Sequence, residues 1–576
     1  MGDHGVNGTY GSNGDSHSSV DATESLIGEL PAWTPRRKIK VITVGAGFSG
    51  LMFAHKLQHQ YPEVGQMVDH SIFEARHDVG GTWLVNTYPG VQCDVPAHIY
   101  AFPFDPKPDW DNFYASGAEI EAYIRATVKK WNLDRDVRLN HRVTEAIWQQ
   151  ETGRWKVTVE KPGGETSTEY ADVLVSGQGV LNKWRWPDIP GLERFQGFKC
   201  HSAAWDADYD YSNKRIAVIG NGSSGVQIVP QLAKLPGTQI TAVQRSANYV
   251  YMPLPPSTLL GREGDNRANP PFTEEDKERF RKDPVFHRAY RRKIVHHINS
   301  AFRMYIKGSA ANQAATEMAR NQMATKLQHD PELCAKLIPS WPLGCKRITP
   351  ADGFLESLLR PNVDLVSSPV TAVTEDSIVT ADGRAFQVDV IVCATGFDVS
   401  FRPQWRMIGR DGVDLGQQWA GDGVRSYLSV AAKDMPNFFM FLGPNAVIAH
   451  GSLLEAINWT GDYITRWIRK MATEDIKAVV PKGACVDDLV RYGDRVHETL
   501  VWSAGCSSWF KRNTVDGRVT AAFGGSALLF KRLISEIRAE DFDIEYRDPN
   551  RWSFLGSGFT DYELDPGNCL SWYIER

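Results

Sequence analysis

Two short glycine-rich segments are the first features of the sequence that could carry chemistry. They run Gly45-x-Gly47-x-x-Gly50 and Gly220-x-Gly222-x-x-Gly225, each directly after a short apolar run. A strand, a glycine turn and a helix in this order bring backbone N–H groups and the positive end of the helix dipole to a pyrophosphate. One such motif is weak evidence, but its context occurs twice here, which disfavours two ordinary glycine turns. Both turns are predicted to bind dinucleotides, with Ser223 and Ser224 among the residues of the second site.

The residues at the ends of the next strands distinguish the two ligands. Glu74 ends the run 71–73, where a carboxylate can accept hydrogen bonds from both ribose hydroxyls and repel a 2′-phosphate. In the second unit, Arg245 and Ser246 end the run 240–244, where a guanidinium can hold a 2′-phosphate. The first turn is therefore predicted to take an unphosphorylated adenosine and the second to prefer NADP(H) to NAD(H). A surface arginine without a ligand is the alternative for Arg245.

The most specific motif lies between the two glycine turns. The segment Phe195-x-Gly197-x-x-x-His201-x-x-x-Trp205-Asp206 resembles the fingerprint of type I Baeyer-Villiger monooxygenases. Between about residues 38 and 535 the chain also resembles this family at Gly80-Gly81-Thr82-Trp83, at Tyr88-Pro89-Gly90 followed by Asp94, at Lys346-Arg347 and at Ala394-Thr395-Gly396. It departs from the family at Thr87, where a basic residue often stands before Tyr-Pro-Gly. It also departs at Ser176-Gly177-Gln178, at the end of the first unit's closing strand, where the family has Ala-Thr-Gly.

The resemblance implies an enzyme that uses FAD and NADPH, and it assigns residues to the parts of that enzyme. Thr82, Trp83, Asp94 and Tyr100 would contact the flavin, Lys346 would join Arg245 and Ser246 at the NADP phosphate, and Trp509 resembles the tryptophan of a mobile loop that closes over bound NADP. His201 and Trp205 are expected to tie the linker between the domains rather than to perform chemistry.

Arg347 is the candidate for stabilising the charge that develops during oxygen transfer. Attack on a ketone carbonyl builds negative charge on oxygen, and a guanidinium stabilises that charge without supplying a labile proton. Asp94 would hold Arg347 in place and balance its charge. A purely structural ion pair is the alternative.

These residues need an α/β framework of two nested Rossmann-like dinucleotide-binding domains. Each glycine turn is followed much later by a near-identical closing strand, 172–175 and 389–392, and turns at 162–164 and 382–383 suit hairpins just before them. The expected divisions are a flexible tail at 1–36, an FAD-binding domain at 37–180 and 385–576 with a C-terminal extension, an NADP-binding domain at 181–250 and 341–384, and a helical insert at 251–340.

Apolar residues at helical spacing dominate the predicted insert. They are Phe286, Tyr290, Ile294, Ile298, Phe302 and Tyr305, surrounded by many arginines and lysines. This pattern predicts a packed helix with a solvated basic face, and a membrane-surface or calmodulin-like role is the alternative. The neighbouring His296 and His297 point apart on a helix, so no metal site is expected there.

Composition limits the class of protein. The chain has 576 residues, 42% of them hydrophobic and 23% charged, with a net charge of -5. This indicates an ordinary globular protein, with no basic excess for nucleic acid and no membrane span or signal peptide. Eight cysteines without a C-x-x-C pair are expected to be reduced and structural. We expect a cytoplasmic monomer.

The predicted function is insertion of one oxygen atom from O2 next to a ketone carbonyl, which gives an ester or lactone at the expense of NADPH. The long insert encourages a bulky natural product as substrate. A flavin monooxygenase that oxygenates nitrogen or sulfur atoms is the nearest alternative, and Asp206 at the end of the fingerprint favours the ketone-oxidising branch. A dinucleotide-sensing interaction protein without turnover is an alternative of a different class.

Overall fold

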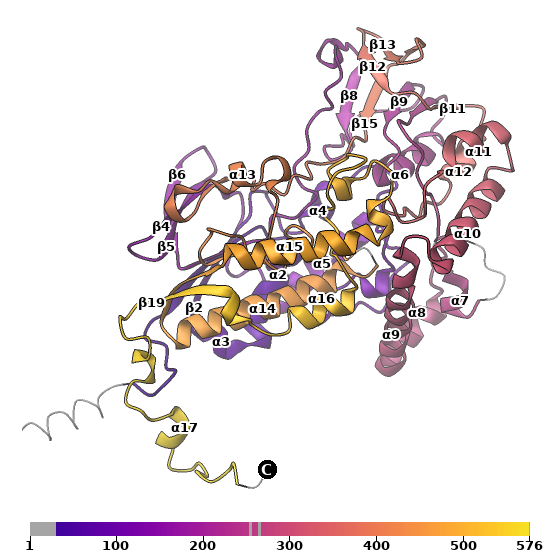
Figure 1. The fold of residues 1–576 in the computed structure, drawn as a ribbon. Coiled ribbons are helices and arrows are strands. Elements are labelled where there is room, and N and C mark those ends of the chain that lie inside the picture. The colour runs from indigo at the N-terminus through magenta and orange to yellow at the C-terminus, as the bar shows by residue number, and fades with distance from the viewer. Residues whose placement is uncertain (1–29, 253–255, 263–266, 449, 575–576) are drawn as a thin grey trace, which may run out of the picture.

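The first glycine turn belongs to a parallel five-stranded sheet in the order β17-β7-β1-β2-β3. The computed structural model describes residues 30–252, 256–262, 267–448 and 450–574 (Figure 1). The strands are β1 (Ile39–Val44), β2 (Val68–Phe73), β3 (Val137–Arg138), β7 (Val173–Ser176) and β17 (Phe438–Met440). All four residues of β7 are buried, as expected for a parallel strand covered on both faces. Helices α2 (Phe48–His55), α5 (Gly117–Trp131) and α14 (Leu453–Thr473) supply much of the core packed against this sheet.

The second glycine turn belongs to another parallel sheet, in the order β11-β10-β9-β15-β8. Its strands are β8 (Phe198–His201), β9 (Arg215–Ile219), β10 (Gln239–Val243), β11 (Val363–Val366) and β15 (Val390–Cys393), with helices α6 (Ser223–Leu232) and α12 (Phe354–Ser357) beside them. In both sheets the strand that leads into the glycine turn lies between the next strand and the predicted closing strand. The predicted pair of nested Rossmann-like units is confirmed.

Two smaller sheets lie between the main strands, and their pairs are antiparallel except for β16 with β4, which is parallel. One sheet has the order β16-β4-β5-β6 and another the order β12-β13-β14. Their strands are β4 (Arg142–Gln149), β5 (Arg154–Glu160), β6 (Thr166–Ala171), β12 (Val370–Val373), β13 (Ser377–Thr380), β14 (Ala385–Gln387) and β16 (Arg406–Ile408). The turns at 162–164 and 382–383 connect antiparallel partners, which confirms both predicted hairpins.

The region between β10 and β11 is helical and lies to one side of the sheets (Figure 1). It holds α7 (Pro256–Leu260), α8 (Glu274–Lys282), α9 (Pro284–Ser300), α10 (Ala310–Lys326) and α11 (Pro331–Leu337). Asp283 caps α9 by accepting a hydrogen bond from the Phe286 backbone, and Tyr290 and Ile294 are buried. Most of the basic side chains around them are exposed, as a packed helix with a solvated basic face requires. Among the described residues no helix is long and apolar enough to cross a membrane.

The C-terminal part of the chain returns to the first unit. It contains α13 (Leu415–Gln418), the hairpin of β18 (Ile476–Pro481) with β19 (Phe542–Tyr546), and helices α15 (Gly483–Glu498), α16 (Ala527–Leu533) and α17 (Asp561–Leu564). Helix α14 packs on α2, and α15 and α16 lie alongside it in Figure 1. The remaining short helices are α3 (Pro62–Gln66) and α4 (Thr82–Val85).

At two places the expected division of the chain differs from the strand pairing and contacts in the structure. Strand β15 pairs with β8 and β9, so the second unit extends past Cys393, whereas the sequence division assigned everything after 384 to the first unit. The predicted tail covers 1–36, of which 1–29 lie outside the described residues. Residues 30–36 pack on the C-terminal segment, because the Ala32 N–H donates to the Phe559 carbonyl and Arg36 donates to the Ser553 carbonyl.

Candidate active site

The glycines of the two turns are required for different reasons. A Cβ atom on Gly45 would lie 2.7 Å from the Gly177 carbonyl oxygen, and one on Gly220 would lie 2.4 Å from that of Ala394, so these first glycines serve close packing of strands. A Cβ on Gly47 would meet nothing nearer than 3.5 Å, and one on Gly222 nothing within 4 Å. Both middle glycines have ordinary negative φ angles. Neither protein packing nor backbone geometry requires glycine there, which fits the close approach of a bound pyrophosphate.

The third glycine of each turn holds its helix against the turn. A Cβ on Gly50 would lie 2.1 Å from the Gly45 carbonyl oxygen, and one on Gly225 would lie 1.9 Å from that of Gly220. The N-termini of α2 and α6 are therefore fixed directly behind the turns. Ser223 and Ser224 begin α6.

Glu74 lies at the first turn, as predicted from the end of the preceding strand. The side chain is buried, and one carboxylate oxygen accepts a hydrogen bond from the Ala46 backbone at 2.8 Å. The other oxygen accepts one from the Arg76 backbone at 2.9 Å. A carboxylate oxygen has a further lone pair, so Glu74 can still accept from a ribose hydroxyl.

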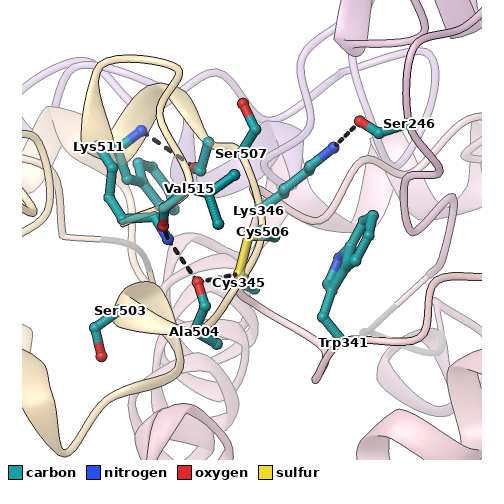
Figure 2. The surroundings of a disulfide bond; sticks show 12 residues. Ser246, Trp341, Cys345, Lys346, Ser503, Ala504, Cys506, Ser507, Lys511 and Val515 are labelled. Carbon is teal, nitrogen blue, oxygen red and sulfur yellow. Dashed lines mark hydrogen bonds between the residues drawn. A yellow bond between two sulfur atoms is a disulfide. The ribbon is translucent and has the colours of Figure 1, made fainter. Parts of the chain in front are cut away.

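Three side chains that the sequence assigned to a phosphate converge at the second turn. Lys346 Nζ donates to Ser246 Oγ at 2.8 Å and to the Ala247 carbonyl at 3.1 Å, and it lies 4.9 Å from the centre of the Trp341 ring (Figure 2). Burial and then the nearby Arg245 guanidinium lower the pKa of Lys346 to about 8. Arg245 is exposed and makes no hydrogen bond or ion pair with any described residue. Two cations that face each other without a protein carboxylate form a site for an anion.

An aromatic cluster covers the first turn. Trp83 and Tyr100 pack edge to face, with ring centres 5.6 Å apart, and Trp83 Nε1 donates to the Tyr100 hydroxyl at 3.3 Å. Burial raises the pKa of Tyr100 well above its usual value, so its hydroxyl keeps its proton. Thr82 begins α4, directly after Gly81, whose φ of +57° is favoured by glycine. These apolar rings suit the face of a flavin.

Arg347 and Asp94 form a bidentate ion pair. Arg347 Nε lies 2.5 Å from Asp94 Oδ2, and Nη2 lies 2.6 Å from Oδ1. The side chains are 27% and 18% exposed, so a small reactant can still reach the pair. Burial acts to lower the pKa of Arg347, but the Asp94 carboxylate outweighs it and raises that pKa, which keeps the guanidinium charged. Asp94 lies between Trp83 and Tyr100 in the sequence of the first unit, and Arg347 follows Lys346 of the second.

Tyr305, from the helical insert, lies beside the guanidinium and was not predicted as a site residue. Burial raises its pKa to about 12, and the charge of Arg347 acts in the opposite direction. Its ring closes on Gly344, where a Cβ would lie 3.0 Å from Tyr305 Cδ1, and it stands 5.7 Å from the Trp502 ring. The helical spacing marked Tyr305 only as a core position. Helices α10 and α11 follow it before the chain returns to the second unit, so no local pattern indicated that it would lie beside Arg347.

The fingerprint residue His201 contacts both the linker and the second unit. It is fully buried and stacks on Trp184 of the linker, with ring centres 4.5 Å apart. Its Nδ1 accepts from the Ala203 backbone at 3.1 Å, which leaves the proton on Nε2, 3.3 Å from Thr395 Oγ1. Burial lowers its pKa to about 4, so it is neutral at physiological pH. Trp205 stacks on Tyr211 at 4.7 Å.

Trp509 lies in the segment 501–515, partly buried against Phe510, with ring centres 4.7 Å apart. The same segment corrects one prediction, because Cys345 and Cys506 form a disulfide (Figure 2). Reduced thiols were predicted throughout, because 161 residues separate this pair and spacing alone cannot reveal such a bond. The other six cysteines are free. The described residues contain no cluster of three or more potential metal ligands.

Comparison with known proteins identifies the family of this chain. A model of the flavin-binding monooxygenase-like family matches residues 37–252. The FAD-binding monooxygenase tazF of Aspergillus terreus is 39% identical over 561 residues, which cover 97% of this chain and 98% of the relative. A Baeyer-Villiger monooxygenase of Pseudomonas aeruginosa is 30% identical over 89% of this chain and 93% of its own. A crystal structure of cyclohexanone monooxygenase from Rhodococcus sp. Phi1 bound to NADP+ matches with a TM-score of 0.74 at 27% identity, over 88% of this chain and 99% of that one.

The chain therefore belongs to the family of FAD-dependent, NADPH-using monooxygenases of the Baeyer-Villiger type. The family predicted from the fingerprint at 195–206 is confirmed.

Proposed function

We propose that this enzyme inserts one oxygen atom from O2 beside the carbonyl of a bulky ketone. The observation that carries the proposal is the bidentate Arg347–Asp94 pair, which lies between the aromatic cluster of the first unit and the cationic site of the second. A fixed, partly exposed guanidinium at this place supplies permanent positive charge where reacting oxygens would gather.

The two cofactors fit different units. FAD would be held at the first turn by Gly45, Gly47 and Gly50, by Glu74 at the ribose, and by Thr82, Trp83, Asp94 and Tyr100 at the flavin ring. NADPH would be held at the second turn by Gly220, Gly222, Ser223, Ser224 and Gly225, with Arg245, Ser246 and Lys346 at its 2′-phosphate and Trp509 closing over it. With both cofactors bound, the flavin would activate O2 and NADPH would supply the electrons.

The chain's own residues position and stabilise the reacting atoms. Asp94 fixes both the direction and the charge of the Arg347 guanidinium, which can then face a carbonyl oxygen as negative charge develops on it. Because the pKa of Arg347 is raised, it cannot serve as a proton donor at neutral pH. The buried Tyr100 and Tyr305 hydroxyls also stay protonated, so the site offers few labile protons.

A bulky ketone is the substrate that the surroundings of Arg347 favour. The helical insert brings Tyr305 beside the guanidinium and Phe302 against His450, with ring centres 4.7 Å apart. These aromatic side chains can form an apolar wall for a large carbon skeleton. A natural product of secondary metabolism is the class we propose.

A panel of ketones and sulfides of graded size tests this function. Purified enzyme receives NADPH in air, and mass spectrometry detects products that have gained one oxygen atom. We expect oxygen transfer to large ketones, with esters or lactones as products. Transfer confined to sulfides or amines would favour the alternative monooxygenase class instead.

A further inference from the structure

The Cys345–Cys506 disulfide joins the second unit to the segment 501–515, which we call the closing loop. The two Cα atoms are 6.3 Å apart, and both residues are buried, at 0% and 1% exposure. Cys345 directly precedes Lys346 and Arg347, and Cys506 lies three residues before Trp509. The bond therefore connects residues proposed for NADP(H) and charge stabilisation with the loop proposed to cover the cofactor (Figure 2).

The closing loop is organised internally by a buried lysine. Lys511 Nζ donates to the carbonyls of Ala504 and Val515, both at 2.5 Å, and so ties the two ends of the loop together. The Ser507 hydroxyl donates to the Asn513 carbonyl at 2.8 Å across the loop. A loop held in this way moves as a unit, so its attachment at Cys506 affects the placement of the whole loop.

The start of the loop has its own anchors away from the disulfide. Trp502 is fully buried, and Lys307 of the insert donates to Ser503 Oγ at 2.9 Å. The Cys345 sulfur also lies 3.4 Å from the Ala504 carbonyl oxygen, which would accept a hydrogen bond from a reduced Cys345 thiol. Reduction should therefore loosen the loop at Cys506 without unfolding it.

We propose that the Cys345–Cys506 bond positions the closing loop against the Lys346–Arg347 segment, and that its oxidation state sets how tightly the site holds NADP(H). Oxidation removes two protons and two electrons from the thiols. Hydrogen peroxide, which this class of reaction releases when oxygen is reduced without transfer, accepts them and becomes two water molecules. A dithiol reverses the change and is itself oxidised to a disulfide. The inference rests on the proposed function, because that function assigns Lys346 and Trp509 to NADP(H).

Because both sulfurs are buried, the effect of bound NADP+ on the reduction of the disulfide can also be measured. Both cysteines are buried in this structure, so a reductant can reach the bond only when the closing loop moves away. If loop closure and NADP+ binding favour each other, each must stabilise the other by the same free energy. Bound NADP+ should therefore protect the disulfide from reduction.

The first experiment measures that protection on the FAD-loaded enzyme. A dithiol is added with or without NADP+, and alkylation followed by peptide mass spectrometry times the appearance of thiols at Cys345 and Cys506. We expect NADP+ to slow their appearance about fivefold or more. The exposed Cys569 is the internal control and should be alkylated at the same rate in both samples. Equal reduction rates at a saturating NADP+ concentration would overturn the proposal, as would free thiols at both positions in aerobically prepared enzyme.

The second experiment compares NADP+ dissociation constants by calorimetry. Oxidised wild type is compared with reduced wild type and with Cys345→Ser, Cys506→Ser and the double variant, and Cys569→Ser is the matched control. Reduction and each single substitution should weaken NADP+ binding about fivefold or more, and the double variant should be no weaker than either single one. Equal affinities of the oxidised and reduced wild type would refute the positioning role, even if a variant fails to fold.

The outcomes separate this inference from the proposed function. If NADP+ does not bind to the oxidised enzyme at all, the proposed function fails. If it binds with an affinity that depends on Arg245 but not on the disulfide, only the inference about Cys345 and Cys506 fails.

Discussion

Arg347 has the geometry of a group that stabilises charge rather than of one that transfers protons. Its two hydrogen bonds to Asp94 fix the plane of the guanidinium, and its raised pKa keeps it charged across the range in which enzymes work. An ion pair with a purely structural role could also have this geometry, so substitution must separate the two possibilities.

Replacement of Arg347 by alanine should separate cofactor binding from oxygen transfer. The variant should keep its FAD and bind NADPH, because other residues make those contacts. Loss of one charge stabiliser costs about 2.7 to 4 kcal/mol, so ester formation should fall roughly a hundredfold to a thousandfold. NADPH oxidation should then end in hydrogen peroxide, which a peroxidase assay measures.

The conservative variant Arg347→Lys controls for charge. It keeps a positive charge but loses the bidentate contact with Asp94, so its loss of ester formation should be smaller. Flavin reduction and product formation are timed separately in stopped flow. Ester formation by Arg347→Ala at the parental rate would show that the ion pair is structural.

Arg245 should decide the choice between NADPH and NADH. It is exposed and has no partner among the described residues, so its substitution disturbs little of the protein. A charge-assisted contact is worth about 1.5 to 3 kcal/mol, so Arg245→Ala should raise the KM for NADPH roughly tenfold to a hundredfold and leave that for NADH nearly unchanged. Arg194, an exposed arginine paired with Glu193, offers a matched control. If Arg245→Ala still prefers NADPH to NADH as strongly as the parent enzyme, the second unit does not hold the 2′-phosphate of NADPH at Arg245.

The lowered pKa of Lys346 should make NADPH binding depend on pH. Burial and Arg245 lower its pKa to about 8, so the side chain is charged below this pH and neutral above it. The KM for NADPH should therefore rise as the pH increases through about 8. Because a bound phosphate favours the charged lysine, this rise should extend to somewhat higher pH values. Lys346→Arg should abolish that dependence, because arginine stays charged. A KM that rises equally steeply in this variant would point to another group.

The elements were the part of the structure most fully predicted from the sequence. Strands and glycine turns have local signals, such as apolar runs, turn residues at 162–164 and 382–383, and the start of a helix. The closing strand at 389–392 was correctly matched to the second glycine turn, but the division placed at 385 separated this strand from β9, because local patterns do not show where a domain ends. The Cys345–Cys506 bond and the approach of Tyr305 to Arg347 were missed because they join segments far apart in the sequence, which local patterns do not reveal.

The two middle glycines should have different effects when replaced. A Cβ atom at Gly47 would lie 3.5 Å from the Gly81 backbone and one at Gly222 would meet nothing within 4 Å, so we expect the fold to survive a valine at either position while its side chain occupies the space of a pyrophosphate. Gly47→Val should yield protein without visible flavin absorbance. Gly222→Val should remain yellow but be reduced slowly by NADPH. The opposite pattern in absorbance spectra would mean that the two units are assigned in reverse.

At the scale of the whole molecule, several contacts hold the two units face to face. Tyr88, from the motif that follows the first turn, donates to the Gln227 side chain on α6 at 2.9 Å. A Cβ on the nearby Gly90 would lie 2.8 Å from the Gln227 carbonyl oxygen, so this turn packs directly on the helix. The Arg347–Asp94 ion pair also joins the two units, and His201 stacks on Trp184 of the linker between them.

Oxygen insertion beside the carbonyl can be traced directly with labelled oxygen. The best ketone from the panel is converted by purified enzyme with NADPH under 18O2, and fragment masses locate the label in the product. We expect one 18O atom, at the bridging oxygen of the ester or lactone, with the original carbonyl oxygen unlabelled. A product without the label, or one that carries it as a hydroxyl group on an intact ketone, would contradict the proposed function.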